Sequence, residues 1–253
     1  MNEQSPRFWP LFFELYESLP RQGPGNRECA ARALALCGSL LDEPRVLDLG
    51  CGVGGQTFYL AELTSGLITA VDSHAPSIER LQSAVVARGE SGRIRPLVGD
   101  MSDLDLPPES FDLVWSEGAL YNIGMEKALL VCRGLLRSGG CLAFTDAVWR
   151  KDDPPREVRE SFEADYPEMG RVPDVLAAIE KSGFALLGHF TLPDEAWWDD
   201  FYRPMVIRIG EMRLKYAGDD EAQRILVQLA REPEMHKFYS DYYAYEFFVA
   251  RRE

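Results

Sequence analysis

Between Arg45 and Asp146, short apolar runs alternate with longer stretches in which apolar residues recur at helical spacing. The apolar runs are "RVLDLG", "LITAVDS", "IRPLVGD", "FDLVWSEG" and "CLAFTDA", and the helical stretches include "QTFYLAEL", "PSIERLQSAVVARG" and "KALLVCRGLL". Short apolar strands separated by helices are typical of a parallel sheet that is covered on both faces. The pattern therefore predicts a doubly wound, Rossmann-like α/β domain.

Both flanks of this core have a different pattern. Asn26 suits the N-cap of a helix in the first flank, and in the second a mainly helical stretch separates the runs "FALLGHFTL" and "YYAYEFFVARR". We expect a mostly parallel sheet of seven strands with an antiparallel C-terminal strand. The expected organisation is a single domain over 1–253, with N-terminal helices that form a cap (1–44), a core that carries the ligand site (45–150) and a helical, aromatic-rich lid inserted between the last two strands (193–240).

Composition narrows the classes of partner. Lys and Arg total 27 and Asp and Glu total 41, so the net charge of −14 repels nucleic acid and anionic membranes. The five cysteines form no Cys-x-x-Cys pair and do not group with the three histidines, which argues against disulfides and a metal site. Pro10, Glu14 and Glu17 interrupt the apolar N-terminal stretch, which therefore resembles neither a signal peptide nor a membrane span. We expect a cytoplasmic protein.

The stretch "VLDLGCGVGG" follows the first predicted strand and crowds glycines at the point where an open α/β sheet binds its ligands. Gly50, Gly52 and Gly55 also satisfy the pattern G-x-G-x-x-G, so an NAD-dependent dehydrogenase is an alternative. Asp48 would be unhelpful beside a pyrophosphate, because both groups are anionic. A ligand with an ammonium and a sulfonium group would instead benefit from this acid.

Two further acids end the next strands. Asp72 ends "LITAV", where a carboxylate can accept hydrogen bonds from ribose hydroxyls, or where it can simply cap the following helix. Asp100 follows "IRPLVG" and can accept from an exocyclic adenine amine, with Met101 against the ring; the alternative is an ordinary turn acid.

Taken in order, "VLDLGCGVGG", "AVD", "GDM", "FDLVWSEGAL" and "LLRSGGCLAF" resemble the successive motifs of the class I S-adenosylmethionine-dependent methyltransferases, in the small-molecule branch that includes ubiquinone and menaquinone methylases. The segments "RQGPGN" and "WSEGALYNIG" also resemble a set of bacterial methyltransferases. The resemblance implies S-adenosylmethionine as cofactor and S-adenosylhomocysteine as product. The cofactor-binding residues that it implies are Asp48, Gly50, Cys51, Gly52, Gly54, Gln56, Asp72, Ser73, Gly99, Asp100, Met101, Ser116 and Glu117, with Gln22 and Gly23 approaching from above.

Methyl transfer needs a general base only if the acceptor arrives protonated. Glu117 is the first candidate, Asp146 and His189 are weaker ones, and catalysis without a base is equally open. Aromatic residues flanked by acids suit an apolar or a cationic acceptor, although the same rings would also serve as core or as a homodimer contact. The candidate substrate residues are Trp9, Tyr16, Tyr121, Asn122, Trp149, Trp197, Trp198 and Tyr202.

The sequence thus predicts an enzyme that transfers a methyl group from S-adenosylmethionine to an unidentified small molecule. Two alternatives stay open: a module that binds S-adenosylmethionine without turnover, and an NAD-dependent dehydrogenase.

Overall fold

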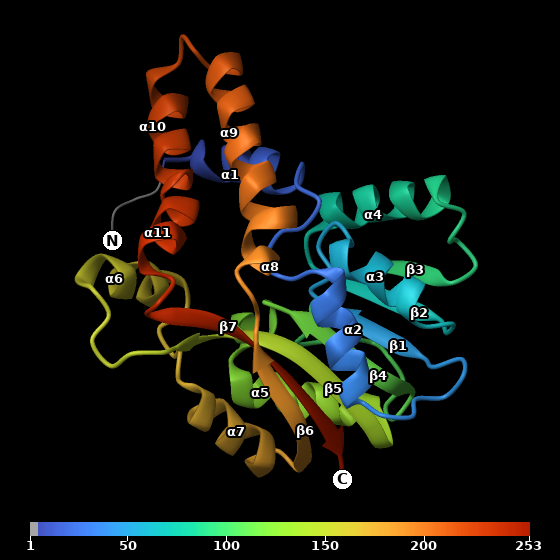
Figure 1. Cartoon of the computed structure of the whole chain (residues 1–253). Coiled ribbons are helices and arrows are strands. Elements are labelled where there is room, and N and C mark those ends of the chain that lie inside the picture. Colours follow the sequence, from blue (N-terminus) through green and yellow to red (C-terminus); the bar gives the residue numbers. More distant parts are fainter. Residues whose placement is uncertain (1–4) are drawn as a thin grey trace.

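The computed structural model describes residues 5–253, so residues 1–4 of the predicted N-terminal cap lie outside the described residues. Figure 1 shows a twisted sheet with helices on both faces and a further group of helices at one end. The sheet has seven strands in the order β3-β2-β1-β4-β5-β7-β6. The strands are β1 (Val46–Leu49), β2 (Ile68–Asp72), β3 (Ile94–Val98), β4 (Phe111–Glu117), β5 (Leu136–Trp149), β6 (Phe184–Thr191) and β7 (Tyr243–Arg252).

Strand directions confirm the predicted topology. β1 to β5 pair in parallel, and β7 inserts between β5 and β6 and is antiparallel to both. Every residue of β1 is buried, as expected for a central strand that is covered on both faces. The predicted seven-stranded, mostly parallel sheet with an antiparallel C-terminal strand is therefore correct.

Two hydrophobic layers cover the sheet. Helices α2 (Arg27–Leu36), α3 (Gly55–Leu63) and α4 (Ala75–Ala87) contribute Ala33, Leu60 and Leu81 to the core of one face. Helices α5 (Met125–Leu135) and α7 (Val172–Lys181) cover the other face. As predicted, Asn26 caps α2, because its side chain accepts a hydrogen bond of 2.8 Å from the backbone N–H of Cys29.

A third hydrophobic cluster joins the helices beyond the carboxyl ends of the strands. Leu11 and Leu15 of α1 are buried in this cluster together with Met205 and Leu226, and in Figure 1 the hairpin of α9 and α10 projects away from the sheet. The predicted 193–240 segment is helical over most of its length, and α1 and α6 join it. The helical layer consists of α1 (Phe8–Tyr16), α6 (Arg156–Asp165), α8 (Glu195–Trp197), η2 (Trp198–Tyr202), α9 (Arg203–Lys215), α10 (Asp220–Leu229) and α11 (Arg231–Tyr239), while the short η1 (Leu120–Ile123) follows β4.

None of the helices formed by residues 5–253 has the length and apolar character that a membrane crossing requires. Within the same residues, no group of His, Cys, Asp and Glu side chains is arranged to hold a metal ion.

Candidate active site

A cavity of about 1380 Å³ lies between the carboxyl ends of the strands and the helical layer. Its sheet end is lined by the loop after β1, by the ends of β2 and β4 and by the segment 21–24, which we call the strap. Its helical end is lined by residues of α1, α6, η2, α11 and β7. Topology thus brings one continuous space to the edge of the sheet where open α/β folds bind their ligands.

The glycine loop after β1 is shaped by close contacts within the protein. Gly50, Gly52 and Gly54 all have positive φ (71°, 53° and 94°), a conformation that favours glycine. A Cβ at Gly50 would overlap Ala119, and a Cβ at Gly52 would overlap the amide oxygen of Gln22. These positions therefore have no room for a side chain, because neighbouring segments pack directly on the loop.

Asp48 lies behind this loop. Its carboxylate is fully buried and accepts hydrogen bonds from Thr57 Oγ1 (2.6 Å) and Gln56 Nε2 (3.3 Å). Burial raises the pKa of Asp48 to about 7, and the nearby Glu117 adds to this shift. Asp48 does not line the cavity, whereas Gln56 does. Asp48 therefore contacts the cavity wall only through Gln56, and its predicted role in cofactor binding stays a prediction.

Asp72 lies at the end of β2 and lines the cavity. Its two carboxylate oxygens accept from the backbone N–H groups of Gly52 (2.9 Å) and His74 (2.8 Å). His74 is the N-cap of α4 and makes no side-chain capping bond itself, so Asp72 forms a turn just before that helix. The residue is held rigidly by backbone groups and still faces the cavity, as a ribose-binding acid must.

The adenine-side candidates also line the cavity: Ser73, Gly99, Asp100 and Met101. The carboxylate of Asp100 is exposed and accepts 2.8 Å from the backbone N–H of Ser102, and hydrogen bonds to Ser102 lower the pKa of Asp100. Asp100 therefore has the predicted turn geometry and a free carboxylate oxygen at the cavity rim.

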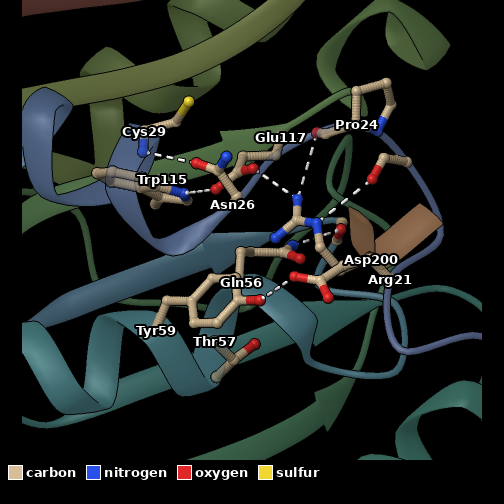
Figure 2. A network of polar contacts seen from close by, with 12 residues as sticks. Arg21, Pro24, Asn26, Cys29, Gln56, Thr57, Tyr59, Trp115, Glu117 and Asp200 are labelled. Atoms are coloured by element: carbon tan, nitrogen blue, oxygen red, sulfur yellow. Dashed lines mark hydrogen bonds and ion pairs between the residues drawn. The ribbon is translucent and has the colours of Figure 1, made fainter. Parts of the chain in front are cut away.

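Glu117 forms a buried ion pair with Arg21, which Figure 2 shows. Arg21 Nη2 donates to Glu117 Oε2 at 2.6 Å, Trp115 Nε1 donates to Glu117 Oε1 at 2.8 Å, and the side chains of Arg21 and Glu117 are 3% and 2% exposed. Both oxygens are thus engaged, and the guanidinium compensates the negative charge. Glu117 lines the cavity, but both of its carboxylate oxygens are held by other side chains of the protein, so its role as a general base stays a prediction.

The strap is built around this ion pair. Arg21 also donates to the carbonyls of Gly23 and Pro24, each at 3.3 Å. Gly25 has a φ of 146°, and a Cβ there would overlap both Glu117 and Arg21. Gln22 and Gly23 line the cavity, and Gln22 Oε1 accepts a hydrogen bond of 3.0 Å from the N–H of Val53. Their approach to the cofactor stays a prediction.

Tyr59 connects the strap to the helical layer. The guanidinium carbon of Arg21 lies 5.8 Å from the centre of the Tyr59 ring, and the Tyr59 hydroxyl donates to Asp200 of η2 at 2.7 Å (Figure 2). The glycine loop, the strap and the inserted helices are therefore joined by polar contacts on one side of the cavity.

The helical end of the cavity is rich in tyrosine and contains a carboxylate that the sequence analysis did not single out. Tyr16 and Tyr202 both donate hydrogen bonds to Glu232 of α11. We call this end the aromatic chamber and define it by Tyr16, Tyr121, Tyr166, Trp197, Tyr202, Glu232 and Tyr245. Burial raises the pKa of Glu232, although its two hydrogen bonds from tyrosine oppose that change.

The structure divides the predicted substrate residues into two groups. Tyr16, Tyr121, Asn122, Trp197 and Tyr202 line the cavity. The other three lie outside it: Trp9 is 52% exposed, Trp149 packs against Phe162, and Trp198 packs against Tyr202.

Several other candidates also lie outside the cavity lining. Ser116 is buried and donates to the carbonyl of Leu49 at 2.8 Å, and Gly54 lies beneath the loop against Leu81. His189 pairs with Glu246 on β7, and Asp146 accepts 2.9 Å from Tyr166, with burial raising the pKa of Asp146 to about 7. His189 and Asp146 therefore do not reach a ligand in the cavity directly.

The central part of the chain is similar to known methyltransferases. Residues 47–144 match the family model described as a methyltransferase domain. Sterol 24-C-methyltransferase ERG6A of Gibberella zeae is 30% identical over 188 residues, which cover 70% of this chain and 48% of that protein. The chain thus spans about half the length of the curated relatives it matches.

Solved structures agree on the fold. A SAM-dependent methyltransferase from Geobacter sulfurreducens in complex with S-adenosyl-L-homocysteine superposes with a TM-score of 0.80 at 18% identity, covering 96% of this chain and 98% of that one. The [4+2]-cyclase SpnF superposes with a TM-score of 0.74 at 19% identity, covering 96% and 92% of the two chains. The chain therefore shares its fold with these solved structures. The match of residues 47–144 to the methyltransferase domain model agrees with the resemblance seen in the motifs.

Proposed function

We propose that the chain binds S-adenosylmethionine at the sheet end of the cavity and transfers the methyl group to a small molecule in the aromatic chamber. One observation carries the proposal: a single cavity connects the glycine loop, Asp72 and Asp100 with the tyrosines of the helical layer. Donor and acceptor can therefore share one space, which an in-line displacement requires.

The residues at the sheet end fit this cofactor. Asp72 would hold the ribose, and Asp100 and Met101 would lie against the adenine. Arg21 Nη1 is a buried donor without a hydrogen-bond partner among residues 5–253, and a cofactor carboxylate would supply the missing acceptor. The acids Asp48 and Asp72 favour a ligand that carries positive charge.

When bound, the cofactor supplies a methyl group that is activated by a sulfonium. The protein then has to align the acceptor and exclude water. The strap and the helical layer cover the sheet end from above, and the buried pair of Arg21 and Glu117 fixes the strap in this position. We assign Glu117 to this positioning role.

The dehydrogenase alternative is weaker. The antiparallel β7 between β5 and β6 departs from the 3-2-1-4-5-6 order of dinucleotide-binding domains. The buried Asp48 behind the loop also disfavours a pyrophosphate there. Binding of S-adenosylmethionine without turnover remains the alternative to test.

The test is calorimetry followed by a turnover assay. S-adenosylmethionine and S-adenosylhomocysteine should bind, NAD should not, and acceptor-dependent formation of S-adenosylhomocysteine should follow with a pool of small molecules. Binding of both cofactor forms without any methyl loss would favour the module without turnover. Binding of NAD alone would refute the proposal.

Two further parts of the proposal concern the cellular location of the protein and its oligomeric state. We place the protein in the cytoplasm, supported by its acidic composition. A homodimer contact through the insertion is supported by exposed apolar residues of α9, among them Val206, Ile207 and Leu214. Cell fractionation and gel filtration test these two points.

A further inference from the structure

The aromatic chamber contains a carboxylate without a positively charged partner. Glu232 accepts hydrogen bonds from the neutral hydroxyls of Tyr16 and Tyr202, and no Lys, Arg or His among residues 5–253 forms an ion pair with it. An ionised carboxylate that is shielded from bulk water is costly unless a cation compensates it. Glu232 lines the cavity, so a ligand in the chamber can provide that cation.

The walls around Glu232 suit an organic cation. Tyr16, Tyr121, Tyr202 and Tyr245 present aromatic surface to the same space. Electron-rich ring faces attract ammonium groups, and they do so more strongly where water is excluded. An anionic or purely apolar acceptor would leave the charge of Glu232 uncompensated.

The mouth of the chamber is negatively charged, as is the Glu232 carboxylate inside it. Acids of α6 and α11 line it, and among the described lining residues of these two helices Arg231 is the one cation. The acids are Glu157, Glu160, Asp165 and Glu234. Such a field favours the entry of cations and disfavours that of anions.

Tyr245 provides an independent observation at the point where the chamber meets the sheet end. Its hydroxyl lies beside Gly118, directly after β4, because a Cβ at Gly118 would be 3.2 Å from it. Tyr245 lines the cavity, and none of the hydrogen bonds within residues 5–253 involves its hydroxyl. A polar ligand group at the end of β4 would satisfy it.

We propose that the methyl acceptor is an amine, which enters the aromatic chamber as an ammonium ion and pairs with Glu232. The inference rests on the proposed function and specifies its substrate class. The Glu232 carboxylate takes one N–H proton, and the freed nitrogen lone pair forms the new N–CH₃ bond. The S–CH₃ bond breaks with its electron pair remaining on sulfur, so that the products are a methylated ammonium, S-adenosylhomocysteine and a proton that leaves from Glu232. The raised pKa of Glu232 suits a carboxylate that accepts this proton.

Three probes of similar size and different charge test the inference: phenethylamine, 2-phenylethanol and 3-phenylpropanoate. Each is titrated by calorimetry into the protein saturated with S-adenosylhomocysteine. We expect the amine to bind at least about tenfold more tightly than the alcohol, and the carboxylate to bind most weakly. Equal affinities, or a preference for the carboxylate, would overturn the inference.

Two variants with the same change in net charge locate the effect. Glu232→Gln keeps an oxygen acceptor for one of the two tyrosines and presents an amide N–H that the hydroxyl of the other can accept. It should lower the affinity for phenethylamine about tenfold while leaving that for 2-phenylethanol unchanged. Glu211→Gln, in the exposed pair with Arg208 on α9, should leave both affinities unchanged. A preference for the amine that survives Glu232→Gln would remove Glu232 from the proposal.

Binding of S-adenosylhomocysteine is measured first, so the two proposals can fail separately. Loss of that binding counts against the proposed function, and the probes are then titrated into the free protein. Normal binding without a preference for the amine counts against the amine acceptor alone.

Discussion

The guanidinium of Arg21 lies 2.6 Å from the carboxylate of Glu117, and their side chains are almost completely removed from solvent. The two residues belong to the strap and to β4, so this contact fixes the strap over the glycine loop. This contact is the basis for the positioning role proposed for Glu117, whose carboxylate lies at the cavity wall.

Replacing Arg21 should destabilise the fold. Arg21→Met leaves the Glu117 charge buried and unpaired, which should lower the free energy of unfolding by about 3–5 kcal/mol. The double variant Arg21→Met/Glu117→Gln should recover part of the loss, because the orphan charge is removed. Urea denaturation of the wild type, Arg21→Met, Glu117→Gln and the double variant measures the coupling energy between the two residues. Additive losses would show that the ion pair contributes no coupling energy.

Gly25 should tolerate no side chain. Gly25→Ala places a Cβ against the Arg21–Glu117 pair at a φ of 146° and should destabilise the fold by about 1–3 kcal/mol. Gly23→Ala is the matched control in the same strap, since nothing lies within 4 Å of a Cβ there. Similar melting temperatures for the two variants would contradict the packing described for Gly25.

Asp72 should matter for cofactor affinity. Asp72→Ala removes the acceptor that faces the ribose and also releases the N–H of Gly52, so we expect affinity for S-adenosylmethionine to fall by one to two orders of magnitude, on the order of 1.4–2.8 kcal/mol. Asp103→Ala, an exposed acid outside the cavity lining, serves as the control in calorimetry. Unchanged affinity in Asp72→Ala would remove the ribose assignment.

Asp48 should make stability depend on pH. Its pKa is raised from 3.8 to about 7 by burial, so the folded state holds a proton that the unfolded chain has lost. The stability linked to this proton is fully present below the pKa of Asp48 in the unfolded chain. It is lost as the pH rises through the pKa of Asp48 in the folded protein.

The variant Asp48→Asn has no such titration. It should match the wild type at about pH 4 and be more stable at about pH 8, with an upper bound of about 4 kcal/mol at roughly 1.4 kcal/mol for each pH unit between the two pKa values. Denaturation of both proteins at the two pH values measures this difference in the free energy of unfolding. Asp42→Asn serves as the surface control. Greater stability of the wild type at about pH 8 would mean that the carboxylate is charged and well compensated.

The strands and the helices between them could be predicted because their signals are local. The apolar run "VLDL" becomes a fully buried β1, and the acids at the ends of β2 and β3 reach the cavity because parallel strands end at a common edge. Asp48 was correctly expected near the loop, but the sequence could not show that Thr57 and Gln56 would enclose it.

Contacts between distant segments had no such signal. Arg21 and Glu117 are 96 positions apart, and nothing in "LPRQGPGN" indicates that its arginine is buried. Glu232 follows Arg231 in a helix of mixed charge whose sequence is typical of an ordinary solvated face. The glycines and the proline of the strap were the available sign of a chain that must pass close to other groups.

The aromatic residues of α1 show a second limit. The rings of "FWPLFFELY" share one side of the helix, and Trp9 and Tyr16 are two turns apart on that side, so periodicity cannot distinguish them. In the structure Trp9 is 52% exposed, whereas Tyr16 donates a hydrogen bond to Glu232. The packing of α1 against α9 and α10 determines which of these two rings is exposed and which faces the cavity.

The place of β7 in the sheet imposes an order on folding during synthesis. β6 lies at the sheet edge and pairs with β7, which is made about fifty residues later, after the whole helical insertion. While the ribosome extends the chain, β1 to β5 can associate as they emerge, whereas β6 waits with its backbone groups unpaired. Tyr243 and Tyr245 then arrive on the same late strand, so the sheet edge and the ligand chamber are completed in one step.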